Sequence, residues 1–381
     1  MIESRVKAIH SLTSLRGILA LWVLLYHFWD IVIQFFPIAI NLKSFMESGP
    51  LAVAGFFILS GYVLSYNYAR RFINSSNADY FDFLRARIAR IYPVHLFTLF
   101  LTLVLWVLAR RSGVSIPNSS YSLSTFIENL FLIQAWVPTF QFTWNYPAWS
   151  ISSEWFAYLL FPIFWMIFRS ALKSTRTSIF LLIACTFGMI YIYAIPYNGL
   201  FKHLICVAPT FLSGCAIYSC LSTNPEQNRS FRYAPEILGI LLIVSTLFLP
   251  PRQSTIILMV GFVSLVCLLA WMADNCSSFW TSPQLMALGD VSYSLYMTHF
   301  IALRVMIRLL KPGNYEHKSL FVRIAVMAVY ASFTILMCLA VYFLVEKPAR
   351  LKFKKTRNTH KELIHSQVKQ NEIELNQGIV N

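Results

Sequence analysis

Residues 14–30, SLRGILALWVLLYHFWD, form an apolar run that could cross a membrane but carries Arg16 and His27 inside it. Apolar windows of about 20 residues recur as far as residue 345. Hydrophobic residues make up 57% of the 381-residue chain and charged residues only 12%, about half the charge of a soluble domain. The sequence therefore predicts an all-α, multi-pass membrane protein. It excludes an ordinary soluble enzyme, a disordered protein and a secreted disulfide scaffold.

Hydropathy windows predict about ten transmembrane helices, which together form one membrane domain over residues 1–350. The segment 122–137 is apolar but interrupted by Glu128, Asn129 and Gln134, so we expect an interfacial or re-entrant segment there. Residues 351–381 are basic and then polar, which is typical of a disordered tail. The predicted spans are 15–36, 51–69, 91–109, 148–168, 177–195, 203–221, 235–249, 254–273, 286–310 and 321–345.

The net charge of +15 has a simpler explanation than nucleic-acid binding, because Lys and Arg accumulate in the cytoplasmic loops of membrane proteins. If the N-terminus is inside, 20 of the 31 Lys and Arg residues lie in inner segments and 7 in outer loops. This distribution predicts that both termini are cytoplasmic. Termini on the same side require an even number of spans, which ten satisfies. The seven cysteines are scattered without metal-binding spacing, so we expect them to pack as small apolar residues and expect no metal.

Ionisable side chains inside a membrane are costly and by default mark a function, here a polar intramembrane cavity. Arg16 and His27 are eleven residues apart, which in a helix is within about 20° of three full turns and about 16 Å along the axis. Both side chains therefore face the same way. Imidazole can act as a base near neutral pH. The alternative is that Arg16 snorkels at the inner flank while His27 bonds a neighbouring helix.

Glu154 lies in AWSISSEWFAYLLFP, residues 148–162, about two turns into the outer part of its span and near the expected depth of His27. A carboxylate at that depth could orient and stabilise an imidazole. The nearby polar side chains that could contact a substrate are Trp149, Ser150 and Ser152. The alternative is a structural polar cluster at the start of a helix.

Two further segments carry polar groups. In FLRARIARIYP, residues 83–93, Arg85, Arg87 and Arg90 lie at the cytoplasmic start of a span, where guanidinium groups suit a phosphate-bearing ligand. The alternative is that these arginines only follow the general excess of positive residues in cytoplasmic segments and bind no ligand. In GDVSYSLYMTHF, residues 289–300, His299 follows a polar, tyrosine-rich helix start that either lines a water-filled cavity or forms an interhelical hydrogen-bond network.

Taken together, these segments resemble the acyltransferase-3 family of integral membrane acyltransferases. The matching motifs occur in the family's order up to about residue 350. They are the Arg16-x10-His27 pair, GFFILSGYVLS at 55–65, RxRxxRxxP at 85–93, WSISSEW at 149–155, LGDVSYSLYMTH at 288–299 and EKPAR at 346–350. Each motif alone is weak, but six in register are specific. The chain resembles the single-domain branch of the family.

The resemblance implies an O-acetyltransferase in the cytoplasmic (inner) membrane of a bacterium. It implies acetyl-CoA as donor and a glycan or lipid-linked sugar hydroxyl, such as that of a cell-surface polysaccharide, as acceptor. In this hypothesis Arg16 and the arginines at 85, 87 and 90 bind the donor. His27 is the general base or carries the acyl group, and Glu154 orients His27 or positions the acceptor. Trp149, Ser150, Ser152 and His299 contact substrate. The alternative from another class is a transporter or flippase with His27, Glu154 and His299 as a proton or ion site.

Overall fold

The computed structural model describes residues 9–353, apart from 74–76, 115–117, 138–141, 169, 195–200, 223–232 and 274. These described residues form helices and no strand, which confirms the predicted all-α membrane fold. The longer helices are α1 (His10–Phe35), α3 (Ala52–Tyr68), α4 (Asn77–Arg111), α6 (Ala148–Phe168), α7 (Thr175–Ala194), α8 (Lys202–Ser222), α9 (Ala234–Phe248), α10 (Pro251–Met272), α11 (Pro283–Leu309) and α12 (Leu320–Val341). Two short helices are α2 (Lys43–Glu47) and α5 (Leu123–Leu130).

Each of the ten predicted spans coincides with one of these longer helices. Within the described ranges, eight helical stretches are long and apolar enough to cross a membrane. The other two are α9, which has only 15 residues, and α11, which carries Asp290, Arg304 and Arg308. A crossing number of about ten therefore stays a prediction. The predicted tail begins in helix, which continues to residue 353, and residues 354–381 lie outside the described residues.

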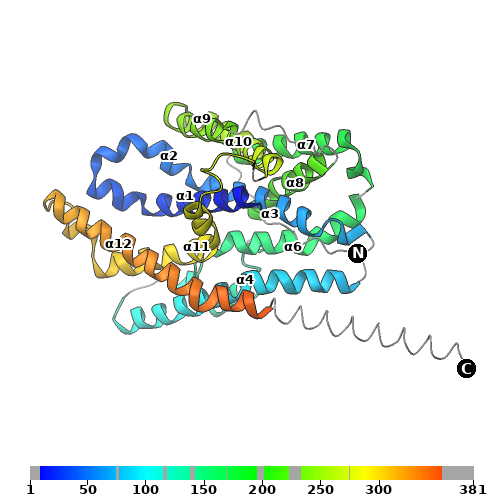
Figure 1. Ribbon diagram of the computed structural model, residues 1–381. Helices are drawn as coiled ribbons and strands as arrows, with labels where there is room; N and C mark the ends of the chain where they lie inside the picture. The colour runs from blue at the N-terminus through cyan, green and yellow to red at the C-terminus, as the bar shows by residue number, and fades with distance from the viewer. Residues whose placement is uncertain are drawn as a thin grey trace, which may run out of the picture.

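The axes of α1, α4 and α6 lie roughly along one direction, with α6 antiparallel to the other two, and α12 crosses this direction obliquely (Figure 1). Helix α4 packs against α6. Ile9 and Thr13 at the start of α1 line the same cavity as Arg350, beyond the end of α12. Both ends of the described chain therefore lie at one end of the helix bundle.

Helices α1 and α11 approach each other closely through two glycines. A Cβ atom on Gly289 would lie 2.0 Å from the backbone oxygen of Thr13, and one on Gly17 would lie 2.7 Å from the backbone nitrogen of Gly289. A Cβ atom on Gly61 of α3 would likewise lie 2.0 Å from the backbone oxygen of Phe211 in α8. These contacts fix the depth of Arg16 relative to α11.

We expect Gly289→Ala to destabilise the protein by about 1–3 kcal/mol, because the new methyl group meets backbone atoms that cannot rotate away. The midpoint of thermal unfolding in detergent measures the effect. Gly239→Ala in α9 is the matched control, because a Cβ atom there would meet nothing within 4 Å. Equal midpoints for the two variants would contradict the close approach of α1 and α11.

The segment between α5 and α6 packs inside the helix bundle. Helix α5 has 8 residues, too few to span a bilayer, which agrees with the prediction for residues 122–137. The Ser152 hydroxyl of α6 donates to the Leu132 carbonyl and accepts from the Ala135 N–H, and the Asn145 amide donates to the Met297 carbonyl in α11. Non-helical backbone therefore reaches the middle of α11 before α6 begins.

Candidate functional site

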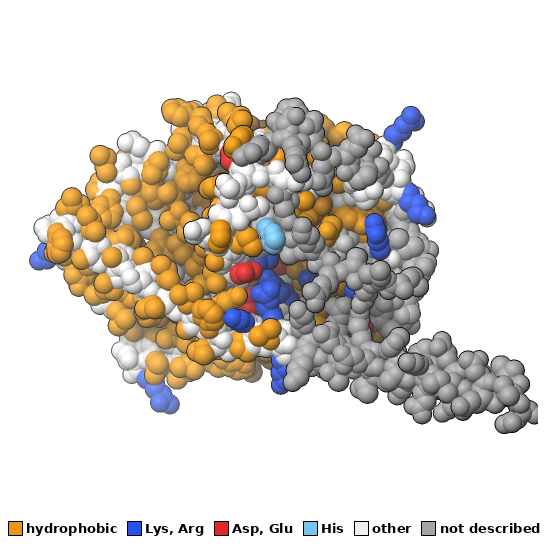
Figure 2. Space-filling model, in the orientation of Figure 1, with side chains coloured by type: hydrophobic (Ala, Val, Ile, Leu, Met, Phe, Trp, Pro, Cys, Tyr) orange, Lys and Arg blue, Asp and Glu red, His pale blue; other side chains and the backbone are white. Residues whose placement is uncertain are grey.

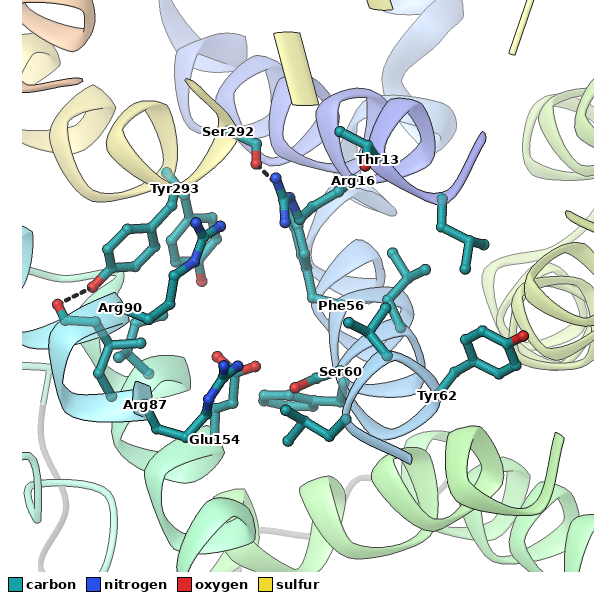
Figure 3. Close-up of a pocket in the computed structure, with 18 of the residues that line it drawn as sticks. Thr13, Arg16, Phe56, Ser60, Tyr62, Arg87, Arg90, Glu154, Ser292 and Tyr293 are labelled. Carbon is teal, nitrogen blue, oxygen red and sulfur yellow. Dashed lines mark hydrogen bonds between the residues drawn. The ribbon is translucent and has the colours of Figure 1, made fainter. Parts of the chain in front are cut away.

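A cavity of about 390 Å³ opens among α1, α3, α4, α6 and α11. Figure 3 shows Arg16, Arg87, Arg90 and Glu154 pointing into it from three of these helices. The other charged residues on its wall are Asp290 and Arg350. Charged side chains also gather in the middle of an otherwise largely hydrophobic face of the molecule (Figure 2). Its wall thus carries four guanidinium groups and two carboxylates, a balance that suits an anionic ligand, and we refer to it as the arginine cavity.

Polar partners hold the arginines in place. The Arg16 Nε–H donates to the Ser292 hydroxyl at 2.9 Å and to the Gly289 carbonyl at 3.2 Å, both on α11. The Arg87 guanidinium donates to the Tyr68 hydroxyl at 3.1 Å and lies over its ring. Because these contacts use only some of the five N–H donors of each guanidinium, the remaining donors can bind a ligand.

Arg85 is the one predicted donor-binding arginine that the structure places outside the cavity. Its side chain is 70% exposed and pairs with Asp82 at 3.5 Å. On helix α4, Arg87 and Arg90 are three residues apart and share a face, whereas Arg85 points away from that face. The expectation that Arg85 lines the donor site is therefore corrected.

His27 and His299 form a pair in the middle of the bundle. The His299 Nε2 atom lies 3.1 Å from the His27 Nδ1 atom, and the rings are 4.9 Å apart. His299 is fully buried. The rings of Tyr146 and Phe300 pack against His27 at 5.5 and 5.4 Å. The sequence assigned His299 to substrate contact, whereas the structure places it directly behind His27.

The surrounding carbonyls set the protonation of both rings. The Nδ1 atom of His27 is 2.9 Å from the Val23 carbonyl, and that of His299 is 3.1 Å from the Leu295 carbonyl. Because a carbonyl oxygen can only accept, each neutral ring carries its proton on Nδ1. The single Nδ1–H of His27 is then shared between the Val23 carbonyl and the His299 Nε2 lone pair. The buried Nε2 of His27 has no hydrogen-bond partner in the described part of the chain, so its lone pair is available as a base.

Glu154 does not lie beside His27. Its carboxylate accepts a hydrogen bond from the Tyr158 hydroxyl at 2.6 Å and lines the arginine cavity. Tyr146, just before α6, is at the depth of His27, and Glu154 is six residues into the helix, about 9 Å farther along its axis. The prediction that Glu154 orients His27 is corrected, because Tyr146 just before α6 contacts His27, whereas Glu154 faces the cavity farther along the helix. The residue that lies next to His27 is His299.

The three predicted substrate contacts at the start of α6 have different surroundings. Ser150 lines the cavity and lies 2.7 Å from the Tyr296 hydroxyl. Trp149 is half-buried, with its ring 4.5 Å from that of His203. Ser152 is fully buried and bonds the backbone of the α5–α6 connection, so it is a structural residue and its predicted substrate contact is corrected.

Tyr296 separates the cavity from the histidines. It lines the cavity, its hydroxyl bonds Ser150, and its ring centroid is 5.9 Å from that of His299. Neither His27 nor His299 lies on the cavity wall. Tyr296 therefore contacts the cavity with its hydroxyl end and His299 with its ring. Sequence reasoning noted Tyr296 only as part of a polar helix start.

Glu346 and Tyr158 are polar residues of the site that sequence reasoning missed. Tyr158 follows Glu154 by four residues, the spacing that lets side chains meet on a helix. Glu346 is a single carboxylate at the end of the last apolar helix, within the EKPAR motif. Among the residues that the structure describes, no group of three or more His, Cys, Asp or Glu could hold a metal ion.

A family model described as an acyltransferase domain, Acyl_transf_3, matches residues 9–344. The chain is similar to the acyltransferase MdmB of Streptomyces mycarofaciens, with 34% identity over 43% of this chain and 41% of that protein. It is 24% identical to the putative peptidoglycan O-acetyltransferase YrhL of Bacillus subtilis, over 90% of this chain and 55% of the relative. It is 22% identical to the O-acetyltransferase OatA of Staphylococcus aureus, over 76% and 49%. The chain spans about half the length of these curated relatives, and no solved structure matches it.

Proposed function

The chain belongs to the acyltransferase-3 family, and from that premise we propose that it transfers an acetyl group from acetyl-CoA to a hydroxyl of a sugar-containing acceptor. The family makes it an enzyme of acyl transfer, and two of its relatives are named as O-acetyltransferases. Acetyl-CoA as donor, the polysaccharide or lipid-linked sugar acceptor and the bacterial cytoplasmic membrane are parts of the proposal.

The arginine cavity supports a phosphate-bearing donor. Arg16, Arg87 and Arg90 present guanidinium groups to one space, and planar guanidinium forks match phosphate oxygens well. The cavity lies at the end of the bundle that holds both described chain ends, which is the predicted cytoplasmic side. CoA made in the cytoplasm would reach the cavity from there.

The histidine pair supports the chemical step. Arg16 and His27 are on one continuous helix, about 16 Å apart along its axis, a distance that an extended thioester arm can span. A turn of the Tyr296 side chain, which breaks its bond to Ser150, would open the way. His27 Nε2 would then take the acceptor hydroxyl proton while the oxygen bonds the acetyl carbon. The carbon–sulfur bond breaks, and the CoA thiolate takes the proton back.

His299 lies where it can assist His27 as a base. Its Nε2 lone pair faces the His27 Nδ1–H, so it would stabilise the positive charge that His27 gains on taking a proton. A route through an acyl-histidine on His27 uses the same two rings. One observation carries the proposal: His27, paired with His299, lies on the same helix as Arg16, which lines the arginine cavity.

Transfer of label tests the proposal directly. We expect membranes that contain the protein, given acetyl-CoA labelled in the acetyl group, to move label into surface glycan, and membranes without the protein to move none. Mass spectrometry of the glycans locates the acetyl ester. Transport of a solute or ion without transfer of label would contradict the proposal and favour a transporter.

A further inference from the structure

The carboxylate of Glu346 is buried at the arginine cavity, on the element that follows α12. The side chain is 1% exposed. It ends a five-residue π-helical turn, Tyr342–Glu346, and such turns occur often at functional sites. A buried carboxylate is costly unless it is paired, so its partners indicate what it does.

Two guanidinium groups share one oxygen of this carboxylate. The Oε1 atom lies 3.6 Å from Nη1 of Arg90 and 3.4 Å from Nη1 of Arg350, and Oε2 accepts from the Ser294 hydroxyl at 2.6 Å. Both distances to Oε1 are longer than a good charged hydrogen bond. Arg90 and Arg350 come from α4 and from the chain after α12, so Glu346 joins two elements far apart in sequence.

We infer that Glu346 is a positioning residue that holds Arg90 and Arg350 as a two-guanidinium clamp for a phosphate group of the acyl donor. This inference rests on the proposed function. Both arginines also line the cavity, so each faces the carboxylate on one side and the open space on the other. One carboxylate against two guanidinium groups leaves a net positive charge, and most N–H donors stay available. A phosphate group supplies the missing negative charge and can accept from both forks.

Without Glu346, the two arginines would repel each other. Like charges brought together in a buried place disfavour one another unless a counter-charge lies between them. Ser294 fixes the second carboxylate oxygen, so the carboxylate cannot turn away from the arginines. The clamp is therefore assembled before the donor arrives, which reduces the ordering cost of binding.

The test measures binding of labelled acetyl-CoA to the purified full-length protein in lipid nanodiscs. We expect Arg350→Gln to weaken binding about tenfold or more, the loss of one charge-assisted contact with the phosphate. Glu346→Gln should weaken binding by a similar factor, because it leaves Arg90 and Arg350 without their shared anchor. Because Glu346 acts through the arginines, the double variant should lose much less than the product of the two single losses. Inorganic pyrophosphate should compete with acetyl-CoA on the unaltered protein and less well on the variants.

Lys347→Gln is the matched control for Arg350→Gln. It removes a positive charge from the same EKPAR motif, but Lys347 is exposed, lies over the Phe343 ring and is absent from the cavity wall. We expect its binding to equal that of the unaltered protein. Thermal unfolding midpoints show which variants are folded. If Glu346→Gln does not fold, Arg350→Gln alone tests the clamp, because Arg350 is partly exposed and its substitution should be tolerated.

The outcomes separate this inference from the proposed function. Unaltered protein that does not bind acetyl-CoA would overturn the donor assignment, and the clamp with it. Tight binding by the unaltered protein together with equal binding by folded Arg350→Gln would overturn the clamp alone. Multiplicative losses in the double variant would show that Glu346 acts apart from the arginines, which also contradicts the inference.

Discussion

His27→Ala should lower acetyl transfer by about 10²- to 10⁴-fold, the contribution of a general base. The same loss is expected if His27 carries the acetyl group itself, because the neighbouring His299 is fully buried and its Nε2 faces His27. The variant should still insert in the membrane, since α1 keeps its apolar faces and its contact with α11 through Gly17 and Gly289. Label transferred from acetyl-CoA measures the rate, and donor binding should stay close to that of the unaltered protein.

The matched control is His317→Ala. His317 is 92% exposed and pairs with Glu316 in a loop, so the same change of residue type there should leave the rate unchanged. His27→Gln keeps a polar side chain of similar size and should be as inactive as the alanine variant. Full transfer by either His27 variant, in folded protein, would remove His27 from the chemistry.

The second large effect is expected at His299. His299→Phe keeps a ring in the buried space but removes the Nε2 lone pair that faces His27 Nδ1–H. We expect kcat to fall about 10²-fold because the imidazolium formed in the transition state loses its partner. The KM for acetyl-CoA should stay the same, because His299 does not line the arginine cavity.

His299→Gln serves as the conservative variant, because its amide oxygen can accept from His27 Nδ1–H and should restore part of kcat. A purely structural role for His299 would give equal losses in both variants. A raised KM for acetyl-CoA with kcat intact would instead place His299 in donor binding, which contradicts the orienting role.

Local patterns in the sequence were sufficient to predict the helices and the shared face of Arg16 and His27. Apolar runs of about 20 residues mark each long helix, and eleven residues of helix bring two side chains to one face. Arg87 and Arg90 were found in the same way, because basic residues at the start of a span are a local signal.

The contacts among the site residues depend on how distant segments pack, and local sequence patterns do not reveal that packing. The surroundings of Glu154 were not predicted, because they depend on where α6 packs. The connection after α5 enters the bundle, and its buried hydrogen bonds to α6 and α11 have no signature in hydropathy. The pairing of His27 with His299 joins residues 272 positions apart. The role that we infer for Glu346 depends on its ion pairs with Arg90 and Arg350, and only the folded chain brings both arginines to one carboxylate oxygen.

The most direct measurement is an experimental structure of the protein with a non-hydrolysable acetyl-CoA analogue. We predict that its phosphates lie among Arg16, Arg87 and Arg90, with Tyr296 turned away from Ser150. The carbonyl that replaces the thioester should lie within about 4 Å of His27 Nε2, the reach of an attacking hydroxyl between them. An analogue bound with its phosphates outside the arginine cavity, or with its acetyl end directed away from His27, would contradict the proposed chemistry.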